Sequence, residues 1–494
     1  WALYLQTHLL EVTGDLDGAL RVIDEAIAHT PTAIDMHGRR ARILKKQGAL
    51  TSAAVTMDEA RQLDLQDRYL NNKATKYFMR ADEVDLAMST IAMFTKHEGD
   101  PQQTLYELQC NWYELELAEA YARRRQWGLA LRKFYAVRKH FLDYTDDMFD
   151  FNGYCMRKTT LRAYFDSIEM LDNSFSHKFY QRALRGALKI FLYLLEFPED
   201  IDGLGHLNPA DRKKERAKRK KAVEKKKIEE KKLEEEDEEG EATKKEDQKK
   251  AKRDAEPDEE VFLAKDFLAE AVQWIAVASK RIDLLDAETA SLIVDLNVRR
   301  GEFAAATKAV REGLQKHPHN HHLVYSLVRL ANKVKTPGKA KLGPSAPEIR
   351  DTLSALVGSP TGTIDVEAFV TAYATRAAEG KSLPQVLSAI RSKVFLDKAS
   401  PATTAAVGSL VSEAALWQGR GVTVPVVLET LKFLTTTYPE EAFTASFKAA
   451  AREKFPQAAV YAPLNTVAEL LSVSSLAAAT SASTDAAHKD ETAK

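Results

Sequence analysis

The sequence predicts an all-α protein made of stacked helix pairs, and two patterns support this fold class. Apolar residues recur at helical spacing over most of the chain, and no sustained alternation of polar and apolar residues indicates an array of strands. Several positions also recur at one fixed period in the first part of the chain. These pairs are Leu10 and Leu44, Gly14 and Gly48, Leu16 and Leu50, Ala19 and Ala53, Ile23 and Met57, and Ala26 and Ala60.

This period, about 34 residues, is typical of the tetratricopeptide repeat, a pair of antiparallel helices. In this repeat a glycine frees the turn between the helices, and small residues let the second helix approach the first. Weaker copies follow at Phe78, Val84, Ala87 and Ile91, at Leu117, Ala118, Tyr121, Trp127, Ala130, Phe134 and Val137, and at Gly301, Phe303, Ala306, Val310, Gly313 and Pro318. We therefore expect a tetratricopeptide-type superhelix (α-solenoid) with repeats in residues 1–200 and 259–335; a generic helical bundle is the alternative.

Composition restricts the function classes. The 494 residues carry a formal net charge of −1, so any attraction of nucleic acid or membrane must come from local patches. Cys110 and Cys155 lie too far apart for a metal-ligand pair, and two cysteines exclude a disulfide framework, which favours a reducing compartment such as the cytosol. No apolar run approaches the roughly 18 residues of a membrane helix. Since the sequence opens at Trp1 inside an amphipathic helical pattern, we expect further helices upstream.

Residues 201–258 form a highly charged insertion. Arg212–Lys227 contains eleven Lys or Arg against two Glu, and Glu229–Glu241 contains nine acidic residues against two Lys. We expect a solvated helix followed by a linker. Dense positive charge on an exposed helix suits the phosphate backbone of RNA, whereas a solubilising face or a nuclear-import signal is the alternative. The candidate RNA contacts are Lys213, Lys214, Arg216, Lys218, Arg219, Lys220 and Lys221.

The rest of the chain divides by composition. Residues 336–347 are rich in Pro, Gly and Lys and are expected to be a linker. Residues 348–471 are expected to form a C-terminal helical domain. The last segment, 472–494, consists mostly of Ala, Ser, Thr and charged residues, so we expect it to be disordered.

Two motifs suggest chemistry, but neither predicts an active site. Arg125–Ala130 (RQWGLA) formally matches an acetyl-CoA-binding loop, yet a helical pattern precedes it where that loop needs a strand, so we interpret it as a turn between helices. A histidine cluster surrounds Pro318 without a cysteine or a suitable carboxylate beside it; its members are His317, His319, His321 and His322. We therefore expect no catalytic residue and no metal site.

A second basic set lies in the helical part of the chain between Arg123 and Arg162. Groups that converge from adjacent helices would make a polyanion pocket, and independent solvated charges explain the spacing equally well. Within this set, Lys158 and Arg162 are four residues apart and would share one face of a continuous helix.

Two stretches carry a family resemblance. Glu59–Lys73 (EARQLDLQDRYLNNK), followed by Lys76 and Tyr77, and Asp146–Arg162 (DDMFDFNGYCMRKTTLR) resemble the auxiliary subunit of the NatA N-terminal acetyltransferase. The order of the parts is also similar to that family, with helical repeats, a Lys/Glu-rich insertion and further repeats. The resemblance is strong as far as about Leu330.

The resemblance implies a scaffold that has no catalysis or cofactor of its own and wraps a small acetyl-CoA-dependent catalytic subunit. It also implies specificity for small N-terminal residues exposed after methionine removal, and attachment to the ribosome in the cytoplasm through Lys213–Lys227. Small regulatory proteins are further candidate partners. An inositol polyphosphate is implied as a structural ligand; Lys139, His140, Arg157 and Lys158 lie in the matching region, and Arg162 is added on geometric grounds. A tetratricopeptide adaptor unrelated to acetylation is the alternative.

Overall fold

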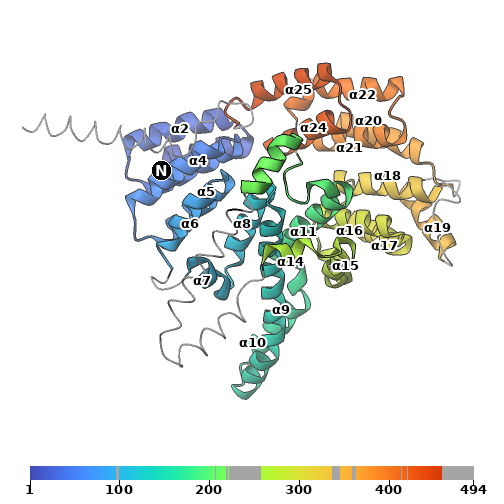
Figure 1. Ribbon diagram of the computed structural model, residues 1–494. Coiled ribbons are helices and arrows are strands. Elements are labelled where there is room, and N and C mark those ends of the chain that lie inside the picture. The colour runs from blue at the N-terminus through green and yellow to red at the C-terminus, as the bar shows by residue number, and fades with distance from the viewer. Residues whose placement is uncertain are drawn as a thin grey trace, which may run out of the picture. The chain divides into compact units, whose positions relative to one another are not determined.

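The computed structural model describes residues 1–95, 100–205, 207–218, 221, 258–335, 345–358, 363–412, 414–419 and 421–458. Every regular element within these ranges is a helix, which confirms the all-α prediction (Figure 1). The chain forms two compact units: unit 1 joins Trp1–Phe94 to Asp286–Lys494, and unit 2 is Thr95–Leu285. The borders expected at residues 200 and 258 both fall inside unit 2, because helices before and after the charged insertion pack on the same two helices.

The first part of unit 1 consists of three helix pairs. Their helices are α1 (Ala2–Thr13), α2 (Leu16–His29), α3 (Ile34–Lys46), α4 (Leu50–Leu63), α5 (Arg68–Arg80) and α6 (Val84–Ala92). The positions that recur from one repeat to the next lie in the core, since Ala19, Ala53 and Ala87 are fully buried and equivalent to one another. The repeat inferred from spacing is thus a packing repeat: a small residue at this position lets each second helix approach its partner.

The turns inside these pairs require a left-handed backbone. Gly14 has a φ of 91° and Gly48 a φ of 82°, and both follow the first helix of a pair. Asp82, the equivalent of Gly48 in the third pair, has a φ of 63° and makes the same turn without glycine. The third copy of the repeat is therefore harder to recognise from its sequence, although its backbone is the same.

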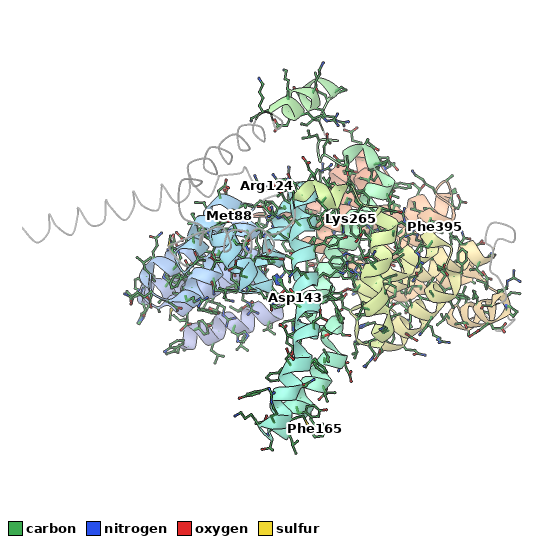
Figure 2. All side chains as sticks on the ribbon, turned by 60° about the horizontal axis from the view of Figure 1, so that its bottom comes forward. Met88, Arg124, Asp143, Phe165, Lys265 and Phe395 are labelled. Carbon is green, nitrogen blue, oxygen red and sulfur yellow. The ribbon has the colours of Figure 1, made fainter. Side chains whose placement is uncertain are left out.

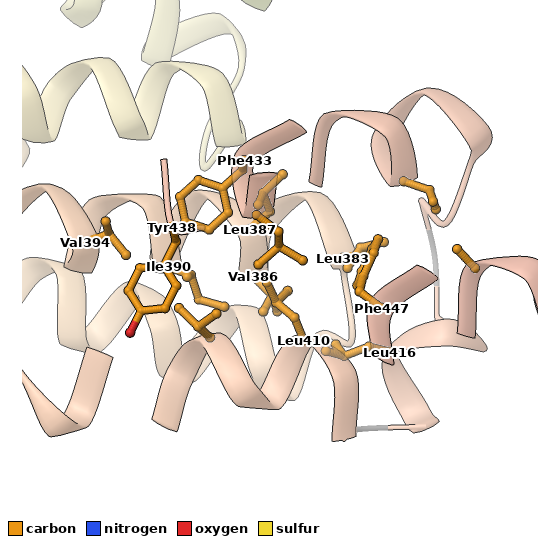
Figure 3. Close-up of a cluster of buried hydrophobic side chains, with 14 of the residues drawn as sticks. Leu383, Val386, Leu387, Ile390, Val394, Leu410, Leu416, Phe433, Tyr438 and Phe447 are labelled. Atoms are coloured by element: carbon orange, nitrogen blue, oxygen red, sulfur yellow. The ribbon is translucent and has the colours of Figure 1, made fainter. Parts of the chain in front are cut away.

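The rest of unit 1 contains a later repeat and the C-terminal helices. These helices are α16 (Ala287–Arg300), α17 (Phe303–Lys316), α18 (His321–Lys335), α19 (Ala346–Leu356), α20 (Val366–Glu379), α21 (Leu383–Leu396), α22 (Pro401–Ser412), α23 (Ala414–Trp417), α24 (Val424–Thr436) and α25 (Glu441–Lys454). Gly301 makes the left-handed turn between α16 and α17, as in the first repeats. The core of the last helices surrounds Leu387, Phe433 and Phe447 (Figure 3).

Unit 2 is organised around one long helix, α9. Its helices are α7 (Pro101–Glu107), α8 (Asn111–Arg123), α9 (Trp127–Arg157), α10 (Leu161–Asp172), α11 (Lys178–Glu196), α14 (Glu259–Leu263) and α15 (Phe267–Ala278). Helices α8, α11 and α14 all pack on α9, and Trp274 of α15 is fully buried beside Tyr180 of α11. Beyond this core, α9 continues and forms a projecting hairpin with α10 (Figure 1).

Some expectations fall outside the described residues. These are the tail 472–494, the segment 459–471 of the C-terminal domain, most of the linker 336–347, and residues 222–257 of the charged insertion. The end of that linker can be corrected, because α19 begins at Ala346 and Pro347 therefore lies in its first turn, where proline is well tolerated.

Candidate partner-binding surface

The α9–α10 hairpin exposes large apolar side chains. Leu142, Phe149 and Met156 of α9 are spaced by seven residues and are 40%, 85% and 56% exposed. Because seven residues make about two helical turns, these side chains form a line along the helix about 21 Å long. Leu161 and Phe165 of α10 are exposed as well, and Figure 2 shows Phe165 near the end of the hairpin. We call these five residues the hairpin surface; because exposed apolar patches are typical of interaction sites, it is a candidate docking surface.

Acidic residues accompany the hairpin surface. Residues 141–172 contain seven Asp or Glu against three Lys or Arg, a net charge of −4. Four of the acids follow one face of α9, at Asp143, Asp146, Asp147 and Asp150. The partner that fits here is therefore apolar where it meets Phe149 and basic at its rim.

At the core end of α9, Lys139 and His140 have different environments. Lys139 is mostly exposed and pairs with Asp143, with a distance of 2.7 Å between its Nζ and the carboxylate Oδ2. His140 is buried beside the ring of Tyr106, and this burial lowers its pKa to about 4. The imidazole is thus neutral at pH 7, so His140 contributes no positive charge to a polyanion site.

The other three residues of the expected polyanion set lie at the far end of the hairpin. Arg157 and Lys158 are exposed, and Arg157 is 18 residues from Lys139, or about 27 Å along α9. Arg162 is almost fully exposed and lies 3.9 Å from Asp166. The expectation that Lys158 and Arg162 share a helix face is wrong, because α9 ends at Arg157 and Thr159 turns the chain with a φ of 55°. These five side chains do not form one pocket within unit 2, and polyphosphate binding stays a prediction.

The start of the basic run is helical, as expected. Residues 209–218 form a helix on which Lys213, Lys214 and Lys218 are exposed, and Lys221 is exposed as well. Arg216 is tied back by an ion pair to Asp202, with a nitrogen–oxygen distance of 2.5 Å. Arg219 and Lys220 lie outside the described residues.

The base of this helix is held by a buried carboxylate that sequence reasoning missed, Asp200. Its Oδ2 accepts hydrogen bonds from Arg125 at 3.0 Å and from the Tyr193 hydroxyl at 2.8 Å, and its backbone carbonyl accepts one from the Trp127 indole at 2.9 Å. The segment 125–130 is therefore the junction of two helices, as interpreted from the sequence: Arg125 and Gln126 turn the chain, and α9 begins at Trp127. Arg125 itself is the left-handed residue of that turn, with a φ of 57°.

The other candidate sites offer little for chemistry. Burial lowers the pKa of His321 to about 4, with a smaller contribution from His322, and its ring centroid lies 4.0 Å from that of His322. Across the described ranges, no three His, Cys, Asp or Glu side chains converge as metal ligands would. A groove of about 340 Å³ over α21 is lined, among the residues that the structure describes, by small and aliphatic side chains and by Lys393. None of the helices described is long and apolar enough to span a bilayer.

These features define a class of protein: a helical-repeat protein with an exposed apolar hairpin and a basic helix. Residues 1–313 match the family model described as N-terminal acetyltransferase A, auxiliary subunit. The chain therefore belongs to the family of auxiliary subunits of N-terminal acetyltransferase A, which confirms the resemblance found in the sequence. This family comprises the auxiliary, non-catalytic subunits of that complex.

Individual relatives agree with this assignment. The chain is 38% identical over 349 residues to the N-terminal acetyltransferase A complex auxiliary subunit NAA15 of Arabidopsis thaliana, a match that covers 68% of this chain and 38% of the relative. It is 41% identical over 198 residues to human N-alpha-acetyltransferase 16, NatA auxiliary subunit, covering 40% and 23%. A solved structure of Naa15/Naa10 bound to HypK-THB aligns with a TM-score of 0.54 and 26% identity, over 69% of this chain and 43% of that one. The chain thus spans well under half the length of these relatives.

Proposed function

We propose that this chain is a non-catalytic scaffold that binds and activates a catalytic acetyltransferase subunit. The observation that carries the proposal is the hairpin surface, which presents Phe149 and Phe165 to solvent in a member of the auxiliary-subunit family. The related structure contains Naa10 beside Naa15, which supports an acetyltransferase subunit as the occupant. Packing against rigid helices would hold the catalytic loops in a productive geometry, and reaction rate depends strongly on such positioning. The same structure is bound to HypK-THB, which supports a third protein as a further partner.

Co-expression with a Naa10-like subunit tests this proposal. The two chains should co-purify, and the complex should acetylate peptides that begin with Ser or Ala faster than either chain alone. The chain by itself should transfer no acetyl group. Transfer by the single chain would refute the scaffold role, and failure of any acetyltransferase subunit to co-purify would favour an adaptor unrelated to acetylation.

We propose further that the basic helix docks this complex on the ribosome in the cytoplasm, where small N-terminal residues emerge after methionine removal. Exposed Lys213, Lys214 and Lys218 support contact with RNA phosphates, which is sensitive to salt and blind to sequence. Replacing these three lysines with Gln should weaken ribosome co-sedimentation and lower the slope of log affinity against log salt by about 2. A control variant loses the same charge at exposed lysines of unit 1, at Lys316, Lys432 and Lys448. Equal sedimentation of the two variants would remove the assignment.

An inositol polyphosphate that bridges scaffold and catalytic subunit is the last part of the proposal. Because Lys139 and Arg157 are separated along α9, one ligand would contact one end of the hairpin, and the bound subunit would supply the remaining cations. Calorimetry of the complex with inositol hexakisphosphate distinguishes the ends: Lys139→Gln should abolish binding at one end, and Arg157→Gln with Lys158→Gln at the other. Full binding by both variants would contradict this part.

A further inference from the structure

The first three helix pairs of unit 1 separate their charges between two layers. Helices α1, α3 and α5, the first members of each pair, contain nine Lys or Arg and two acidic residues, a net charge of +7. Helices α2, α4 and α6, the second members, contain two Arg and six acidic residues, a net charge of −4. The net charge of the whole chain is close to zero and does not reveal this local separation. The positive layer, formed by α1, α3 and α5, produces a local field that attracts anions.

The centre of the positive layer is a buried carboxylate that three cations share. Glu11 of α1 has a nearly inaccessible side chain, and Arg39, Arg42 and Lys46 of α3 each approach one of its oxygens at 2.7 Å. Burial alone would raise the pKa of Glu11, but hydrogen bonds from Lys46 and Arg39 outweigh it and lower the pKa to about 2. Glu11 is therefore ionised at pH 7, and the cluster carries a net charge of +2.

Linking two helices does not require this excess of charge. One cation would neutralise Glu11, and the mutual repulsion of three neighbouring cations opposes folding. Arg42 and Lys46 keep 53% and 39% of their side chains exposed, so their remaining N–H donors can reach a second anion. The cluster thus binds one carboxylate, that of Glu11, and its remaining positive charge can bind a second carboxylate.

The same cations recur one repeat later. Arg39, Arg42 and Lys46 form a first row along α3, and their equivalents in the next repeat, Lys73, Lys76 and Arg80, form a second row along α5. The residue equivalent to Glu11 in the second repeat is Lys45, which reverses the charge. Tyr77 of α5 lies near cations of both helices, since its ring centroid is 5.8 Å from the Nζ of Lys45 on α3 and 5.9 Å from the guanidinium carbon of Arg80 on α5.

We propose that the two rows form a binding site for an acidic polypeptide segment, whose Asp or Glu carboxylates bridge α3 and α5. Each row spans seven residues, or about 10 Å of helix, which an extended chain passes in three to four residues. A carboxylate is favoured over a phosphate because Glu11 shows the geometry that the first row accepts, with two cations on one oxygen and one on the other. This site lies in unit 1, whereas the hairpin surface belongs to unit 2.

Fluorescence anisotropy with a defined probe tests the proposal. The probe is a labelled peptide of about ten residues that alternates Glu and Ser, and the reference ligands are its Gln–Ser counterpart and a single-stranded RNA of similar length. The 494-residue chain should bind the Glu peptide in a salt-sensitive manner and ignore the Gln peptide. Arg42→Gln with Lys46→Gln, which leaves the Arg39–Glu11 pair in place, should weaken binding about tenfold. Lys432→Gln with Lys448→Gln loses the same charge elsewhere and should leave it unchanged.

Three outcomes would overturn the proposal: equal affinity of the two variants for the Glu peptide, equal affinity of the chain for both peptides, or tighter binding of RNA with the same dependence on Arg42 and Lys46. A measurement on the unmodified chain covers the case in which the variant does not fold. Carbodiimide coupling of the Glu peptide, mapped by mass spectrometry, should join its carboxylates to Lys46 and Lys73. Coupling spread evenly over the exposed lysines would contradict the site.

Discussion

Truncation of the two phenylalanines of the hairpin surface provides the sharpest test of partner binding. Phe149→Ala with Phe165→Ala removes rings that are 85% and 66% exposed, so the isolated chain loses little packing. Substitutions at exposed positions usually change the free energy of unfolding by less than about 0.5 kcal/mol. The thermal midpoint of the variant should therefore equal that of the parent chain.

The effect on binding should be much larger. Full burial of a phenylalanine contributes about 2–3 kcal/mol, and the two rings together expose the equivalent of roughly one and a half such side chains. If the catalytic subunit covers both, the double variant should lose about 3–4 kcal/mol of binding free energy, which raises the Kd by a factor of roughly 100 to 1,000.

Calorimetric titration with a Naa10-like subunit measures this change. The matched control is Leu65→Ala with Leu108→Ala, which truncates apolar side chains of 62% and 65% exposure that do not belong to the hairpin. Control and parent should bind alike. A Kd of the Phe149 and Phe165 variant within about threefold of the parent value would refute the assignment of the hairpin as the docking surface.

Three further predictions concern stability. Arg182→Gln removes the cation that the buried Glu116 and its neighbour Glu119 share. The variant should lose about 3 kcal/mol of its free energy of unfolding, measured by urea unfolding, and an unchanged midpoint would refute this prediction. Glu11 has a lowered pKa in the folded chain, so its contribution is complete above pH 4.5 and is lost as the pH falls toward 2; Glu11→Gln should remove that part of the pH dependence of unfolding, and an identical pH profile would contradict it. Gln109→Gly relieves a left-handed residue with a φ of 51° and should stabilise the chain by about 1 kcal/mol in the same assay; destabilisation would show that the turn is not strained.

The sequence predicted those parts of the fold that depend on local spacing. Ala19 and Ala53 could be identified as core positions because a repeat places equivalent residues in equivalent environments. The left-handed turn at Asp82 was not predicted, because the sequence has no glycine there and aspartate also tolerates this conformation. The length of α9 was not predicted either. The helix continues from the repeat into the hairpin, and no proline in the sequence marks where the repeat ends.

The candidate site was less predictable, because burial and distance depend on residues remote in sequence. His140 looked like a member of a basic cluster, but it is buried beside the ring of Tyr106 from α7, and this burial lowers its pKa well below its ordinary value. Arg157 was grouped with Lys139 because both lie in the region that resembles the family, whereas one uninterrupted helix keeps them apart. Asp200 has no local motif at all, and its importance follows from the hydrogen bonds that reach it from Arg125.

Exposed positions that repeat carry different information from buried positions that repeat. Buried residues recur once in each repeat because every helix pair packs in the same way, so their recurrence says nothing about ligands. Packing imposes no such demand on Arg42 and Lys46, whose side chains are 53% and 39% exposed, yet the half-buried Lys76 and Arg80 repeat their charge in register. The interhelix link to Glu11 does not explain this recurrence, because the equivalent residue of the next repeat is Lys45. The recurrence of these positive charges in register agrees with the proposed acidic segment, which would cross both repeats.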